Sequence, residues 1–172
     1  MKKTNAIIIS LLLITLASVV ISIWSLFFRV NEDIILAPDY APIELEEKAE
    51  RISNDQYKPV ESKKGGGSVS LSYSTNITIN LSDATAELYF ANPGKSNHDM
   101  VLQLSIQDRV IYQSGRLLSG HQLNKINLSE TATFMLQPGG YDGYFQVFYY
   151  DQESAEKAIV NTEIPVSIQV KE

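Results

Sequence analysis

The sequence predicts an all-β domain, an antiparallel β-sandwich, preceded by one N-terminal transmembrane helix. An uncharged apolar run covers residues 6–28, and a two-residue hydrophobic period begins after residue 67. Pairs of Gly, Pro, Asn and Ser separate the alternating segments, as turns between strands do. Because no long helical period interrupts them, several short strands are expected to pack face to face.

The apolar run predicts a membrane span. Residues 6–28 contain no charge, Pro or Gly, and a helix of this length crosses the ~30 Å hydrocarbon core of a bilayer. Lys2 and Lys3 favour a cytoplasmic tail at residues 1–5, with the rest of the chain outside a single-pass cell membrane protein. A cleaved signal peptide is the alternative, disfavoured because no small-residue cleavage site follows the run.

Residues 29–67 are predicted to form an acidic stalk between the span and the domain. Pro38, Pro42 and Pro59 interrupt this stretch, and three glycines at 65–67 suggest a hinge. Residues 43–52 have the charge order of a short helix, with glutamates first and basic residues last. That segment is interpreted either as a solvated spacer or as a docking helix for a partner.

The extracytoplasmic domain is predicted to cover residues 68–172. Alternation of apolar and polar residues marks strands with one buried and one wet face. The predicted inward residues include Ile77 and Ile79, then Met100, Leu102, Leu104 and Ile106, and in the last strand Val160, Thr162, Ile164, Val166, Ile168 and Val170.

Composition excludes several classes of function. The chain has no cysteine, so a disulfide, a thiolate metal site and a lipid-modified cysteine are all excluded. A net charge of −6 without a basic cluster argues against nucleic acid as a partner. His98 and His121 fall in predicted turns, and a metal site with Asp99 requires those turns to converge. No catalytic residue, cofactor or metal is therefore assigned, and the chain is not expected to be an enzyme.

One motif carries a resemblance to known domains. Leu136-Gln-Pro-Gly-Gly-Tyr141 precedes a predicted strand, and it resembles the tyrosine corner of immunoglobulin-like and fibronectin type III-like sandwiches. The resemblance implies a buried Tyr141 whose hydroxyl bonds the backbone just upstream. With the basic tail, single span and acidic stalk, the chain is also similar to membrane-anchored sandwich proteins of Gram-positive bacteria, some encoded on mobile elements. That likeness implies a surface location rather than an activity.

Aromatic residues supply the candidate binding site. If Phe145, Val147 and Tyr149 point into the core, the alternating neighbours Tyr144, Phe148 and Tyr150 point outward. Outward aromatic rings are typical of contact surfaces, and Tyr112 is added as an extension. The alternative is that a loop, the stalk or cross-strand pairs cover these rings.

The predicted function is a membrane-anchored protein-interaction module, an accessory subunit of a cell-envelope or transfer complex. Its partners are the lipid bilayer, through residues 6–28, and an unidentified protein at the cell surface. A surface adhesin or a structural protein that binds a ligand or glycan is the alternative. A stalk of fewer than 40 residues spans at most 3.3–3.6 Å per residue when fully extended. This short reach disfavours the adhesin alternative.

Overall fold

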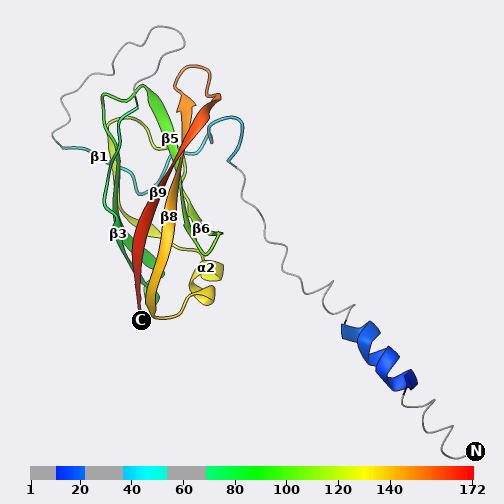
Figure 1. Ribbon diagram of the computed structural model, residues 1–172. Helices are drawn as coiled ribbons and strands as arrows, with labels where there is room; N and C mark the ends of the chain where they lie inside the picture. The colour runs from blue at the N-terminus through cyan, green and yellow to red at the C-terminus, as the bar shows by residue number, and fades with distance from the viewer. Residues whose placement is uncertain (1–10, 22–36, 54–68) are drawn as a thin grey trace, which may run out of the picture. The chain divides into compact units, whose positions relative to one another are not determined.

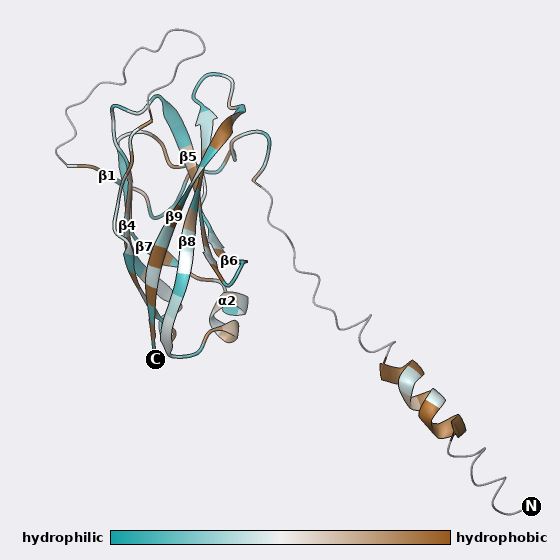
Figure 2. Cartoon of the chain, viewed as in Figure 1, coloured by the Kyte–Doolittle hydropathy of each residue, from teal (hydrophilic) through white to brown (hydrophobic). Residues whose placement is uncertain are grey.

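The structure is a computed structural model that describes residues 11–21, 37–53 and 69–172. The chain forms two compact units, Met1–Ile34 and Ile35–Glu172. In the first unit, residues 11–21 form a mostly apolar helix (Figure 2). The large apolar side chains of this helix are more than half exposed. Within the described ranges, no helix is both long and apolar enough to cross a membrane. The predicted span at 6–28 extends beyond this helix on both sides, into residues outside the described ranges.

The second unit is mostly β (Figure 1). Its elements are β1 (Glu50–Arg51), β2 (Ser72–Tyr73), β3 (Asn76–Asn80), β4 (Thr85–Asn92), β5 (His98–Ile106), β6 (Arg109–Gln113), β7 (His121–Asn127), α2 (Glu130–Met135), β8 (Gly139–Asp151) and β9 (Lys157–Lys171). The alternating pattern does not predict α2, because six residues are too few to show a helical period. Ser129 caps this helix by accepting a hydrogen bond from the Ala132 N–H.

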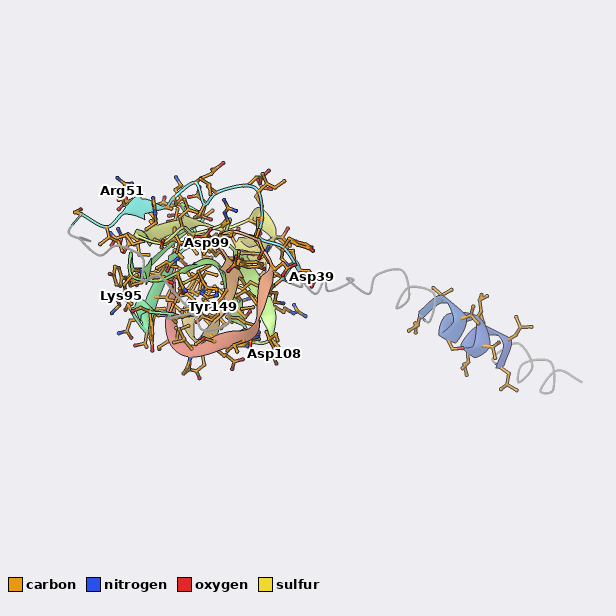
Figure 3. All side chains as sticks on the ribbon, turned by 90° about the horizontal axis from the view of Figure 1, so that it is seen from above. Asp39, Arg51, Lys95, Asp99, Asp108 and Tyr149 are labelled. Atoms are coloured by element: carbon orange, nitrogen blue, oxygen red, sulfur yellow. The ribbon has the colours of Figure 1, made fainter. Side chains whose placement is uncertain are left out.

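All of these strands belong to one nine-stranded sheet in the order β1-β7-β4-β3-β9-β8-β5-β6, with β2 attached to β4. The sheet curls around the core, so that strands far apart in this order face each other (Figure 3). Phe90 on β4 and Phe145 on β8 make an edge-to-face contact with ring centroids 5.8 Å apart. Most neighbouring strands are antiparallel, but β3 runs parallel to β9.

The core confirms most of the predicted alternation. In β9, every second residue from Ile164 to Val170 is buried, and the residues between them are exposed. Val160, also predicted inward, is 69% exposed, so the buried face of β9 begins later than expected. From Asp99 to Ile106, β5 is buried on both faces, including Gln103 and Ser105. Other parts of the chain therefore cover the outer face of β5.

The tyrosine corner is present. The Tyr141 hydroxyl donates to the Gln137 carbonyl oxygen at 3.0 Å and accepts from the Gln137 N–H at 3.3 Å. These bonds close the turn that leads into β8. Tyr141 is partly buried and packs against the core, so its expected burial is confirmed in part.

Part of the predicted stalk is folded onto the domain. Residues 37–53, which we call the strap, are paired with and packed on the β-unit. The short helix predicted for residues 43–52 is not formed. The strap runs along one side of the curled sheet between Asp39 and Arg51 (Figure 3). The predicted boundary at residue 68 is thus too late. The rest of the predicted stalk, residues 29–36 and 54–67, lies outside the described ranges.

Candidate functional site: the strap and the face it covers

Backbone hydrogen bonds attach the strap to three places in the domain. At its start, the Ala41 N–H donates to Ala155 O (2.8 Å), and the Lys157 N–H donates to Asp39 O (2.9 Å). Further along, Glu46 N–H donates to Arg116 O and Arg116 N–H donates to Glu44 O, at 3.1 and 2.9 Å. At its end, β1 pairs with β7. These contacts all involve the end of the domain where β5 and β7 begin and β8 ends.

The strap covers two of the aromatic residues predicted to bind a partner. Phe148 is 5% exposed and Tyr150 is fully buried, in a second apolar cluster with Ala41 and Val101. The Tyr150 hydroxyl donates to Pro38 O at 3.0 Å. Burial, and secondarily the nearby Asp39 carboxylate, raise the pKa of Tyr150 to about 12. The prediction that Phe148 and Tyr150 point away from the main core is confirmed, but their expected exposure is wrong because the strap lies over them.

Tyr112, the predicted extension of that site, also lies against the strap. Its hydroxyl is buried without a well-formed hydrogen bond to any described residue. Burial chiefly, and the Glu46 carboxylate beside it, raise the pKa of Tyr112 well above its usual value. The same carboxylate accepts a hydrogen bond from the Gly115 N–H at 2.7 Å. Glu46 therefore anchors the strap through its side chain as well as its backbone.

Tyr144, the fourth predicted residue, is partly exposed on β8, where it is paired with Ser105 on β5 and Pro165 on β9. It stands apart from the second cluster, which contains Phe148 and Tyr150. The four residues thus do not form one open surface. Binding of a separate partner by them stays a prediction, and for Phe148 and Tyr150 it would require the strap to leave.

A buried carboxylate on β5 connects two loops at the strap end of the domain. Asp99, 5% exposed, accepts from the Gln152 amide at 3.3 Å, and its Oδ2 lies 3.4 Å from Arg116 Nε, an ion pair without hydrogen-bond geometry. Burial raises the pKa of Asp99, and Arg116, Gln152 and the more distant His121 oppose that rise. The described residues contain no group of three metal-binding side chains. This network has the character of a structural clamp.

An open groove lies where the strap meets the hairpin between β8 and β9. Its volume is about 470 Å³, and its lining is Asp39, Tyr40, Glu156, Lys157, Ala158 and Ile159. The Lys157 ammonium lies 4.9 Å from the centre of the Phe148 ring, a cation–π contact. Apolar residues at the start of β9 are exposed, and they form a hydrophobic stretch at the tip of this strand in Figure 2.

Sequence reasoning did not identify the strap as part of this site. The available signal was Ala37, Ala41, Ala49 and Ile52, small or apolar residues inside an otherwise acidic segment. Ala41 and Ala49 do pack on the domain. The groove was missed because half of its wall comes from the strap, at Asp39 and Tyr40, which was predicted to be a solvated connector.

No family model and no curated protein matches the chain. A solved structure with similarity is AggA, the major subunit of aggregative adherence fimbriae type I from Escherichia coli, at 13% identity and a TM-score of 0.30. The match covers 64% of this chain and 99% of that one.

Proposed function

We propose that the chain is a single-span membrane protein that holds an immunoglobulin-like sandwich close to the outer face of the bilayer, where the domain binds another protein. The tyrosine corner at Tyr141 and the core contact between Phe90 and Phe145 support the sandwich architecture. The apolar helix at 11–21, whose large side chains are more than half exposed, supports a membrane location for the N-terminal unit.

The observation that carries this proposal is the strap. Because residues 37–53 belong to the folded domain, only residues 29–36 separate it from the proposed span at 6–28. Eight residues reach at most about 30 Å when fully extended. The domain is therefore held near the membrane, a position suited to an accessory subunit of a membrane-bound complex and poorly suited to long-range adhesion.

The buried carboxylate of Asp99 has a structural role, which fits a binding domain. The pKa of Asp99 is raised, but this residue is held by Arg116 and Gln152 rather than aimed into the open groove.

Topology and binding are tested with single cysteines, since the chain has none of its own. We expect a membrane-impermeant maleimide to label Glu172→Cys on intact cells and Thr4→Cys only after lysis. Both variants should sediment with membranes. Amine-reactive crosslinking of the same cells should join the chain to a second protein. Labelling of Thr4→Cys on intact cells, recovery of the chain in the soluble fraction, or the absence of any adduct would each refute part of the proposal.

A further inference from the structure

We infer that the groove between the strap and the β8–β9 hairpin is a docking site for a basic, partly apolar segment of a partner protein. This inference rests on the proposed interaction role and names the surface and the partner's chemistry.

Exposed apolar side chains mark the groove as a contact surface. Tyr40 and Ile159 line it and are 60% and 104% exposed. Exposed large apolar residues that line one depression, as Tyr40 and Ile159 do, are typical of binding sites.

Charge selects the kind of partner. The groove lining includes the exposed carboxylates Asp39 and Glu156. On the adjoining strap and hairpin, the exposed acids outnumber the exposed cations: the acids are Glu44, Glu47, Glu50 and Glu153, and the cations are Lys48 and Arg51. The basic residue in the lining is Lys157, whose ammonium already lies over the Phe148 ring. This surface therefore attracts lysine and arginine side chains and repels both an anionic bilayer and a second copy of itself.

The rim is rigid enough to act as a preformed site. The Lys157 N–H donates to Asp39 O, and the Ala41 N–H donates to Ala155 O. These two hydrogen bonds join the strap to the hairpin on either side of the Tyr40–Glu156 bridge. Asp151 closes the hairpin by accepting from the backbone N–H groups of Glu153 and Ser154 at 2.9 and 2.8 Å. Binding of a partner therefore costs little conformational entropy of the strap and the hairpin.

The first test uses a photo-reactive residue in the full chain. Ile159→p-benzoylphenylalanine, irradiated in membranes of the producing cells, should form an adduct with a peptide of another protein that contains both basic and apolar residues. Phe134→p-benzoylphenylalanine is the control, because Phe134 is 92% exposed on α2, at the opposite end of the strands. Adducts with lipid, with a second copy or with an acidic peptide, the same adduct from both positions, or no adduct from position 159 would overturn the inference.

The second test measures binding directly. The full chain in detergent is titrated with a short synthetic peptide that alternates lysine and isoleucine, and with one that alternates lysine and serine. We expect the first peptide to bind at least tenfold more tightly, and Ile159→Ser or the pair Asp39→Asn/Glu156→Gln to weaken it at least tenfold. The pair Glu130→Gln/Glu172→Gln removes equal charge from the opposite end and should change affinity less than twofold. Equal losses in both pairs, or equal affinity of the two peptides, would contradict a specific site.

These results separate the inference from the proposed function. Failure of the maleimide topology test would remove the membrane orientation but leave peptide binding at the groove unaffected. Loss of peptide specificity with the expected topology would remove the groove alone.

Discussion

Gly115 offers the sharpest perturbation of the strap. A Cβ atom added there would lie 2.9 Å from both the Glu46 nitrogen and the Leu45 carbonyl carbon, and 3.0 Å from Glu44 O. These are backbone atoms of the strap, so Gly115→Ala must push the strap away rather than turn a flexible side chain. The substitution acts at one middle attachment and leaves the second cluster around Tyr150 intact.

The magnitude follows from the hydrogen bonds at that attachment. Displacement weakens the bonds from Glu46 N–H to Arg116 O, from Arg116 N–H to Glu44 O and from Gly115 N–H to the Glu46 carboxylate. Each neutral bond contributes about 1 kcal/mol net, and one to a charged group somewhat more. We therefore expect the free energy of unfolding to fall by about 2–4 kcal/mol, or by the free energy of strap attachment if that is smaller.

The assay combines urea denaturation with amide hydrogen exchange of the full chain. The amides of Glu46 and Arg116 should lose protection in Gly115→Ala while those of β5 and β8 keep theirs. Gly140→Ala is the matched control, because nothing lies within 4 Å of its added Cβ. If Gly115→Ala were as stable as Gly140→Ala, with Glu46 still protected, the reasoning that places the strap against Gly115 would be refuted.

Three further outcomes are expected. Tyr150→Phe removes the bond to Pro38 and should lower stability by about 1 kcal/mol. The variant should also lack the tyrosine that ionises near pH 12 in an ultraviolet titration of the wild type. Because the pKa of Tyr150 is raised from 10.0 to about 12 on folding, the stability of the wild type should fall as pH rises through that interval, and it should fall less in the variant. Because burial raises the pKa of Asp99, the protonated carboxyl group stabilises the fold fully below pH 3.8, and this stabilisation is lost as pH rises through the folded-state pKa. Asp99→Asn should therefore flatten the dependence of stability on acid pH, measured by urea melts. Identical pH profiles of the variant and the wild type would contradict this expectation. Gly143→Ala places a Cβ 2.5 Å from Ser105 O and 2.6 Å from Ile168 Cδ1, and should destabilise by about 1–3 kcal/mol through overpacking; thermal melts matching Gly140→Ala would contradict that packing.

Much of the β-unit could be predicted because its signals are local. Alternation along β8 assigned Phe145, Val147 and Tyr149 to one face and Phe148 and Tyr150 to the other, and the two apolar clusters divide in this way. The tyrosine corner is equally local, since Tyr141 bonds a residue four positions upstream. Such patterns follow from the geometry of one strand or one turn.

The strap could not be predicted because its contacts are between distant parts of the chain. Leu45 bridges Arg116 and Tyr40 bridges Glu156, each as an isolated pair rather than as part of a ladder. Isolated bridges impose no two-residue period, so the acidic, proline-interrupted composition favoured a solvated connector. Alternation gave the direction of the Phe148 and Tyr150 side chains, but it contains no information about what covers them.

The most direct test of the strap is a disulfide between Tyr40→Cys and Glu156→Cys in a chain that otherwise lacks cysteine. These residues form an antiparallel pair flanked by the Ala41–Ala155 and Asp39–Lys157 hydrogen bonds, the arrangement that brings Cα atoms within about 4.5 Å and permits a disulfide. On mild oxidation of the full chain, we expect an intramolecular disulfide, detected by mass spectrometry of the tryptic peptides. The pair Ile43→Cys/Glu156→Cys should remain reduced. Two free thiols at 40 and 156, or equal oxidation of both pairs, would show that residues 37–53 do not lie on the domain and would remove the basis for both the covered aromatic face and the short membrane tether.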